Sequence, residues 1–239
     1  TINGVGQTTD MTLASGATIN VDASEITDML ADETANRLTI SDQAITVTGA
    51  ITVDNSNLLA AVTSGKLTAT IATTETVTEL ATLSADGGTN DLTIVIRGAD
   101  ATSSTAAQLN AINNATALAV DLTNVTGLAG STLADLGTLA TAITNNQFSN
   151  DTGITTIAVT DTTIDATTLL TRIDQYDQID GVSGLTDMTL ASGATINLDA
   201  SEVTAFIADE AANRLTITNQ VITVTGAITV DNSNSLDAI

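Results

Sequence analysis

The chain of 239 residues contains no Cys, His, Pro or Trp. Without Cys it can form no disulfide, thiolate nucleophile or zinc–thiolate site, and without His it lacks the commonest proton shuttle and metal ligand. The absence of Pro fits strands in which every backbone N–H takes part in a hydrogen-bond ladder. The absence of Cys also fits a protein that is exported from the cell.

Aromatic and basic side chains are scarce. Only Tyr176, Phe148 and Phe206 are aromatic although 43% of the residues are hydrophobic, so a core must consist mainly of Ile, Leu, Val and Ala. Five basic residues stand against 28 acidic ones, which gives a net charge of -23. Such a surface repels nucleic acid and anionic lipid and favours cation binding. We therefore expect no nucleic acid among the partners of this chain.

Long apolar runs are also missing. None approaches the roughly 18 residues that a membrane helix needs, so we expect no membrane insertion. The first residues, TINGVGQ, include neither Met nor a basic leader, and we expect the chain to be part of a longer protein. About a fifth of all positions are Thr, a β-branched residue that suits a half-exposed strand.

The main feature that is present is an internal duplication. Residues 2–57 return 177 positions later as residues 179–234, and the two copies agree at 43 of 56 positions. Exchanges such as Val21/Leu198 and Met29/Phe206 keep an apolar character. Self-similarity at a fixed period is typical of repeat proteins, in which each unit buries its apolar face against a stacked neighbour.

A smaller unit of roughly 25 residues lies within the large repeat. Each unit contains an alternating run typical of a strand, a capping residue, a short helix and a turn. The predicted capping pairs are Asp22 with Glu25, Thr76 with Glu79, and Thr105 with Gln108. Turns or bends are expected at Asn36, Gly49 and the pair Gly87-Gly88.

Consecutive strands lie too far apart for tight hairpins, so we expect parallel strands joined by right-handed crossovers. The fold class that the sequence predicts is a β-rich repeat protein, an elongated parallel β-solenoid with short helices in the crossovers. It would form one continuous domain over residues 1–239.

Three segments rich in Thr, Ala and Asn resemble known repeats. They read LTITNQVITVTGAITVDNSN, ALAVDLTNVTGLAG and TTIAVTDTTIDATTLL. Their composition and repeat texture, which extend over the whole chain, resemble the repeat regions of giant bacterial cell-surface and adhesin-like proteins of the cyanobacterial type. The resemblance implies an extracellular or cell-surface location and a role in adhesion, surface coats, filaments or surface-associated motility.

Aspartates that close predicted strands would lie at similar heights along a solenoid, where a row of oxygen ligands can hold calcium. These candidate metal ligands are Asp22, Asp54, Asp121, Asp161, Asp199 and Asp231. Helix capping is the alternative interpretation of the same residues. The GGxGxD motif of calcium-binding toxin repeats is missing, because Gly87-Gly88 is followed by Thr-Asn-Asp. Calcium, bound weakly, is the only cofactor that we expect.

Candidate catalytic carboxylates have structural interpretations. Asp151-Thr152-Gly153 matches the aspartic protease signature, but that enzyme needs two such carboxylates and the sequence has one, so we expect a turn. Two pairs, Glu25 with Glu33 and Glu202 with Glu210, have the residue types of a glycosidase but lie in the repeated helical segment, where caps and solvated faces are expected. We predict no catalytic residue and no enzyme activity.

The sequence predicts a non-enzymatic structural segment of a large extracellular protein, which forms a filament, surface coat or adhesive stalk by the stacking of repeats. The expected partners are other copies of the chain, joined end to end or laterally, and surface polysaccharide. One alternative is an adhesin or ice-binding module with a Thr-rich face, and another is a β-helix enzyme that acts on polysaccharide. The Thr-x-Thr pairs of the first alternative are Thr46/Thr48, Thr68/Thr70, Thr216/Thr218 and Thr223/Thr225.

Overall fold

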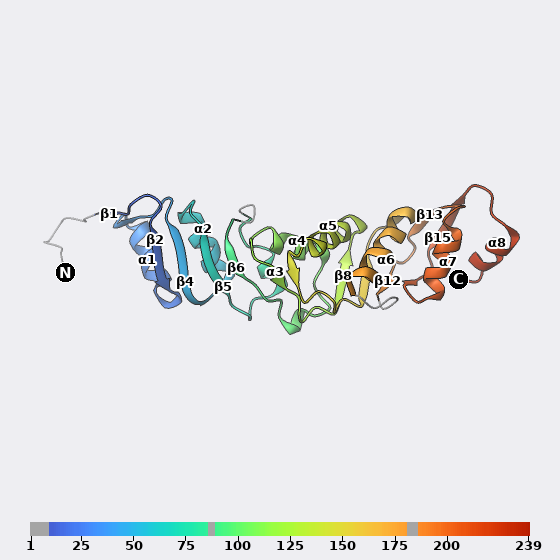
Figure 1. Ribbon diagram of the computed structural model, residues 1–239, viewed down its shortest axis with the longest axis horizontal. Helices are drawn as coiled ribbons and strands as arrows, with labels where there is room; N and C mark the ends of the chain where they lie inside the picture. The colour runs from blue at the N-terminus through green and yellow to red at the C-terminus, as the bar shows by residue number, and fades with distance from the viewer. Residues whose placement is uncertain (1–9, 86–88, 181–185) are drawn as a thin grey trace. The chain divides into compact units, whose positions relative to one another are not determined.

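The structure is a computed structural model of the chain, and it describes residues 10–85, 89–180 and 186–239. Helices and parallel strands alternate along these residues (Figure 1). The chain divides into two compact units. The first comprises Thr1–Val95 and Ala111–Val120, and the second comprises Ile96–Asn110 and Asp121–Ile239.

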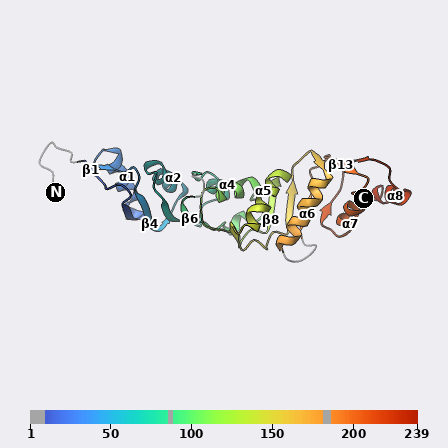
Figure 2. The same ribbon diagram turned by 45° about the horizontal axis from the view of Figure 1, so that its top comes forward.

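The first unit contains two parallel sheets. The smaller sheet pairs β1 (Met11–Thr12) with β3 (Leu38–Thr39). The larger sheet joins, in this order, β2 (Thr18–Asp22), β4 (Ala44–Ile51), β5 (Leu67–Ile71) and β6 (Asp91–Thr93). The helices between these strands are η1 (Ala23–Glu25), α1 (Ile26–Thr34), α2 (Val53–Val62) and α3 (Val77–Leu80). In Figures 1 and 2 these elements, coloured blue to green, alternate as strand and helix.

The four-stranded sheet has a buried aliphatic face and a polar face. Its register aligns Ile45 with Ile19 on one side and with Leu67 on the other, so aliphatic side chains of successive strands stack. Ile45 and Leu67 are completely buried, and each such side chain stabilises the fold by about 1.5–3 kcal/mol. The alternate positions of the strands carry Thr, Asn and Asp, which point to the opposite face because the side-chain period of a strand is two.

The second unit contains two larger sheets. One joins, in this order, β14 (Leu215–Thr216), β12 (Asp187–Thr189), β10 (Thr156–Val159) and β8 (Gly127–Ser131). The other joins β11 (Thr163–Asp165), β13 (Thr195–Asp199) and β15 (Val221–Thr225). The long helices of this unit are α5 (Leu133–Thr144) and α6 (Ala166–Asp180), which pack against each other, followed by α7 (Val203–Ala211) and α8 (Val230–Leu236). The remaining elements of the described residues are η2 (Gly98–Asp100), α4 (Ala106–Asn113), and the paired strands β7 (Val120–Asp121) and β9 (Phe148–Ser149). Residues 111–113 of α4 and Val120 of β7 belong to the first unit.

The predicted parallel β-solenoid is wrong. The described residues form an α/β fold with five small, separate parallel sheets and eight α-helices. The strands stay short because polar residues end them: the run 117–125, which reads as a strand, pairs only at Val120–Asp121. Helices α5 and α6, with 12 and 15 residues, are too long to be simple crossover turns. Parallel strands joined by helices are the building units of Rossmann-like α/β domains.

Several local predictions are confirmed. Asp22 with Glu25 and Thr76 with Glu79 form complete capping boxes. The backbone N–H of Gln108 donates to Oγ1 of Thr105, and the backbone N–H of Thr105 donates to the Gln108 side chain. Asn36 turns the chain with φ of 53°, and Gly49 has φ of 94° where the register of β4 against β5 shifts. Gly87 and Gly88 lie outside the described residues.

The core is aliphatic, with aromatic residues at a few fixed points. Tyr176 of α6 and Phe206 of α7 are the largest completely buried side chains, both in the second unit. The Tyr176 hydroxyl donates a hydrogen bond to the carbonyl of Leu136 at 3.1 Å. Burial raises the pKa of the Tyr176 hydroxyl, and the nearby Arg172 opposes this only in part. Tyr176 therefore joins α6 to α5 as a neutral donor.

The two copies of the duplicated segment fold alike. Gly16 and its counterpart Gly193 have φ of 68° and 70°, and Asn36 and Asn213 have φ of 53° and 57°. Because a left-handed backbone conformation favours Gly and Asn, the conserved Gly and Asn residues keep the same turns in both copies.

Among the described residues, no helix has the length and apolar character needed to cross a membrane. One continuous domain over residues 1–239 stays a prediction.

Candidate functional site

Two of the predicted calcium ligands, Asp22 and Asp199, hold equivalent positions in the two copies and cap the turn that follows. Oδ1 of Asp22 accepts from the backbone N–H and the hydroxyl of Ser24, at 3.0 and 2.6 Å. Oδ1 of Asp199 accepts from the same groups of Ser201, at 2.9 and 2.7 Å. The hydroxyl of Ser24 lowers the pKa of Asp22, and the backbone N–H of Ser201 lowers that of Asp199.

Asp121 and Asp161 also satisfy backbone groups. Oδ1 of Asp121 accepts from the N–H and the hydroxyl of Thr123, at 2.8 and 2.6 Å, and from the Asn150 amide at 3.0 Å. Partial burial works against ionisation of Asp121, but these hydrogen bonds outweigh it and lower the pKa. Oδ2 of Asp161, 28 residues further along the chain, accepts from the N–H of Leu133, the first residue of α5, at 2.8 Å. The cap of this helix is Thr132, whose side chain accepts from the N–H of Asp135.

Asp54 and Asp231 are exposed in the first turns of α2 and α8. The capping hydrogen bonds of these two helices come from Thr52 and Thr229, whose hydroxyls accept from the backbone N–H of Asn55 and Asn232. An acidic side chain in the first turn interacts favourably with the helix dipole.

The six aspartates do not form a row across neighbouring strands. The register places Thr48 beside Asp22 and Thr225 beside Asp199. Within residues 10–85, 89–180 and 186–239, no three His, Cys, Asp or Glu side chains form a group that could hold a metal ion. Four of the six aspartates accept hydrogen bonds from backbone N–H groups, and Asp54 and Asp231 lie in the first turns of helices that threonines cap. Calcium binding stays a prediction.

The candidate catalytic carboxylates are placed as structural groups. Glu25 and Glu202 complete capping boxes, in which their side chains accept from the N–H of Asp22 and Asp199 at 3.2 and 2.9 Å. Asp151 lies directly before a turn and after Asn150, whose φ is 55°.

The polar face of the four-stranded sheet in the first unit aligns threonines on neighbouring strands. The register pairs Thr46 with Thr68, and Thr70 with Thr93. The row of Thr46 and Thr68 ends at Asn20 on one side and at Asp91 on the other. Lys66 Nζ contacts Oδ2 of Asp91 at 2.5 Å beside this face. Two of the four predicted Thr-x-Thr pairs, Thr46/Thr48 and Thr68/Thr70, therefore share one face.

The second unit contains a charge cluster that the sequence reasoning missed. Nη1 of Arg214 lies 2.5 Å from Oδ2 of Asp177 and 3.9 Å from Oδ1 of Asp174, and Nη2 contacts Oδ1 of Asp209. Asp177 and Asp209 are nearly buried. Burial raises the pKa of Asp209, the Arg214 charge lowers it, and the Asp174 and Asp177 charges raise it further, with a raised pKa as the net result.

The first copy retains only part of this cluster. Arg37, the counterpart of Arg214, contacts Asp32, the counterpart of Asp209. The counterparts of Asp174 and Asp177 would precede the duplicated segment, because these two residues lie in α6 before residue 179. No signal in the sequence predicts this cluster, because Asp177 and Arg214 are 37 residues apart and no local pattern links them.

The strands of the two copies differ in their neighbours. In the second copy β12 lies between β10 and β14, and β13 lies between β11 and β15. In the first copy, within the described residues, β1 pairs only with β3, and β2 is the edge strand of its sheet. Nearly the same sequence is therefore central in one sheet and at the edge in another.

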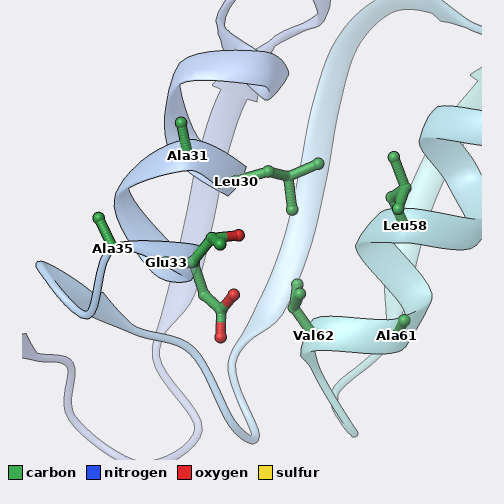
Figure 3. A pocket seen from close by; sticks show the side chains of 8 residues that line it. Leu30, Ala31, Glu33, Ala35, Leu58, Ala61 and Val62 are labelled. Carbon is green, nitrogen blue, oxygen red and sulfur yellow. The ribbon is translucent and has the colours of Figure 1, made fainter.

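A shallow groove lies between α1 and α2 in the first unit (Figure 3). Its volume is about 520 Å³, and apolar side chains such as Leu30, Leu58 and Val62 line most of it. Leu30 of α1 points towards α2, and the carboxylate of Glu33 lies below it. The lining includes no second charged residue, so the groove offers an apolar surface rather than a catalytic arrangement.

Comparison of the chain with protein-family models and with curated proteins finds no match.

Proposed function

We propose that this chain is a non-enzymatic structural segment of a large extracellular protein, in which stacked repeats build a filament, a surface coat or an adhesive stalk. The observation that carries the proposal is the different position of corresponding strands in the two copies, whose sequences are identical except for Val21/Leu198. A strand that is at an edge in one copy and central in the other is built to receive a neighbour.

The use of polar side chains supports a structural role. Several carboxylates that are candidates for catalysis or metal binding accept hydrogen bonds from backbone N–H groups at or just before helix starts, as at Asp22, Asp161 and Glu202. Each such bond satisfies a group that a helix leaves unpaired. An extracellular location is supported by the absence of Cys and by the texture of the repeats.

The charge of the chain suggests how its assembly is controlled. A net charge of -23 makes copies repel each other, so assembly is favoured where a divalent cation screens or bridges the carboxylates. The proposed partners are other copies of the chain and surface polysaccharide, with calcium as the bridging cation. This role needs no dedicated metal site.

Negative-stain electron microscopy of the purified chain, with calcium and with a calcium chelator, tests the proposal. We expect uniform fibres or sheets with calcium and their loss with the chelator. A magnesium control separates general screening of charge from a preference for calcium. Discrete single particles in all conditions, at protein concentrations up to the solubility limit, would contradict the proposed assembly.

A second candidate function uses the Thr-bearing face of the four-stranded sheet, as an ice-binding or adhesin surface. It is favoured by the alignment of Thr46 with Thr68 and of Thr70 with Thr93 on adjacent strands. The test is a thermal-hysteresis measurement on the chain and on Thr68→Lys, with Thr78→Lys on α3 as the control. Hysteresis that Thr68→Lys removes and Thr78→Lys retains would support this candidate, and no hysteresis would exclude ice binding.

A further inference from the structure

The surroundings of identical residues in the two copies show which surface of the first copy is left uncovered by the residues that the structure describes. Met188 of the second copy is completely buried, whereas its counterpart Met11 is 61% exposed. The side chain of Arg214 is 23% exposed and that of Arg37 is 50% exposed. Asp209 and Asp32 differ in the same direction, at 6% and 48%. Met11, Arg37 and Asp32 are therefore less buried than their counterparts in the second copy. Met11 and Arg37 are neighbours, because the backbone N–H of Met11 donates to the carbonyl of Arg37.

In the second copy this surface is covered by the segment 155–177, which supplies two strands and a helix. The backbone N–H of Asp187 donates to the carbonyl of Thr155 at 3.0 Å, and that of Thr195 donates to the carbonyl of Thr162 at 2.9 Å. The strand register places Ile157 beside Met188. On the second strand it places Ile164 beside Ile196.

The helix of the covering segment supplies charge. Asp177 of α6 contacts Arg214 at 2.5 Å, and Asp174 lies 3.9 Å from the same guanidinium. The hydroxyl of Thr167, at the start of α6, donates to Glu202. The residues that receive these contacts are identical in the first copy, where Met11, Ile19, Glu25 and Arg37 stand for Met188, Ile196, Glu202 and Arg214.

We propose that the edges of β1 and β2, together with Met11 and Arg37, form a docking surface for a strand–helix segment of the 155–177 type. The occupant has two short parallel strands, each with an aliphatic side chain facing the core, followed by a helix with two acidic residues three positions apart. Backbone hydrogen bonds along the strand edges provide most of the attachment, and the acidic pair selects the occupant by pairing with Arg37.

This inference deepens the proposed function, because it names the chemistry of the neighbouring repeat. It rests on strand pairing within the second copy and predicts one-to-one docking whether or not fibres form. A chain that docks the segment without forming fibres would retain the inference and lose the proposed function. Fibres that form without docking of the segment would support the proposed function and overturn this inference.

The first experiment adds a fluorescein-labelled peptide of residues 154–178 to the full chain and measures fluorescence anisotropy. We expect saturable binding, together with slower hydrogen–deuterium exchange of the Thr18–Asp22 amides in the presence of the peptide. A peptide with Ile157→Asp and Ile164→Asp is the matched control, and it should not bind, because both substitutions place a charge against the core.

The charge pairing is tested by a double-mutant cycle. A peptide with Asp174→Asn and Asp177→Asn should bind about three- to tenfold more weakly, and the chain variant Arg37→Gln should weaken binding of the unmodified peptide by a similar factor. Combining both changes should cost little more than either alone. Fully additive losses would show that the acidic pair does not meet Arg37 and would overturn this part of the proposal.

A short peptide must also fold when it binds, and this ordering weakens its binding. A second experiment avoids this loss by joining the segment covalently to the chain. In it, residues 150–178 replace Thr1 and run directly into Ile2, which recreates the junction between Gln178 and Ile179. The Thr18–Asp22 amides should then exchange at least tenfold more slowly than in the original chain. The same Ile→Asp changes in the added segment should abolish this slowing. Unchanged exchange in this variant would overturn the proposal, whereas slower exchange supports it even where the free peptide does not bind.

Discussion

Polar side chains in this protein act mainly on the backbone next to them. Asp22, Asp121 and Asp199 each accept from a Ser or Thr two positions later, through both its N–H and its hydroxyl. These bonds are stronger to the ionised carboxylate than to the neutral acid, which is why they lower the pKa of all three residues. An abundance of Asp, Ser and Thr thus supports many short elements rather than one reactive site.

A structural role of Asp161 at the start of α5 can be distinguished from a role as a calcium ligand. Asp161→Ala removes the acceptor for the N–H of Leu133 at the start of α5, and we expect a loss of about 1 kcal/mol in the free energy of unfolding. Urea denaturation with a calcium chelator present measures it. Asp54→Ala is the matched control, because Asp54 is an exposed aspartate in the first turn of α2, and each of the two helices keeps its own threonine cap, Thr132 in α5 and Thr52 in α2. If Asp161→Ala changed stability only when calcium was present, the metal and not the hydrogen bond from Leu133 would explain this residue.

Asp209 gives the pH dependence an unusual sign. Its pKa is raised in the folded protein, mainly by burial, so the folded state holds this proton more tightly than the unfolded state. Its contribution to stability is therefore complete below the ordinary value of 3.8 and is lost as the pH rises through the raised value. Asp22 and Asp199, with lowered pKa values, contribute above 3.8 and lose their contribution as the pH falls through the lowered values.

We expect Asp209→Asn to lose less stability than the parent protein as the pH rises above about 4, because the parent alone has to ionise the Asp209 carboxyl group, whose pKa burial raises. The measurement is the free energy of unfolding of both proteins at a series of pH values from 3.5 to 7 by urea titration. Asp32→Asn, at the equivalent and more exposed position of the first copy, is the control and should leave the profile closer to that of the parent. Parallel profiles for the parent and Asp209→Asn would contradict the raised pKa.

Helix starts could be read from the sequence because a cap is local. Thr76 with Glu79 and Asp22 with Glu25 are three residues apart, and no distant part of the chain is needed to complete the box. The length of α6 was harder to predict, because its final residues are mostly polar. Its buried positions Leu169, Ile173 and Tyr176 nevertheless keep helical spacing to the end.

The division into separate sheets could not be predicted in this way. Alternation of apolar and polar residues marks a strand but does not say which strand it pairs with, or where pairing stops. β10 illustrates this, because its register against β8 shifts within four residues. The Arg214 cluster was missed for the same reason: two of its three acids, Asp174 and Asp177, come from α6, and only the packing of that helix brings them to Arg214.

The equivalent caps of α2 and α8 allow the same capping hydrogen bond to be tested in a packed helix and in an exposed one. Thr52 and Thr229 make the same hydrogen bond, to the N–H of Asn55 and Asn232 at 3.2 and 3.1 Å. Helix α2 buries Val53 and Leu59, whereas α8 has no buried residue. A cap contributes to global stability only where its helix is packed into the cooperative fold.

We therefore expect Thr52→Ala to lower the free energy of unfolding by about 1 kcal/mol, and Thr229→Ala to have almost no effect on it. Thr229→Ala should instead speed hydrogen exchange within α8 alone. Chemical denaturation and exchange mass spectrometry on both variants measure the two effects. Equal losses of global stability would show that α8 is as firmly packed as α2 and would contradict this interpretation.

The duplication makes the chain its own control for the effect of neighbours. Corresponding strands are central in the second copy and at an edge in the first, and the residues that a neighbour covers are buried in one and open in the other. Stability in a repeat array is the sum of the stability of each unit and the interfaces between units. Within the described part of the chain, the second copy therefore includes a stabilising interface that has no counterpart beside β1 and β2 of the first copy.

Methionine truncation measures the stabilisation by this interface directly. Met188→Ala removes a completely buried side chain and should lower the free energy of unfolding by about 2–5 kcal/mol, whereas the same change at the exposed Met11 should cost less than about 0.5 kcal/mol. Urea denaturation of both variants gives the comparison. In the chain extended by residues 150–178, Met11 acquires the surroundings of Met188, so Met11→Ala should then become as costly as Met188→Ala. A cost at Met11 that stays small in the extended chain would mean that its surface does not accept the segment, and that identical sequence is not enough to define this interface.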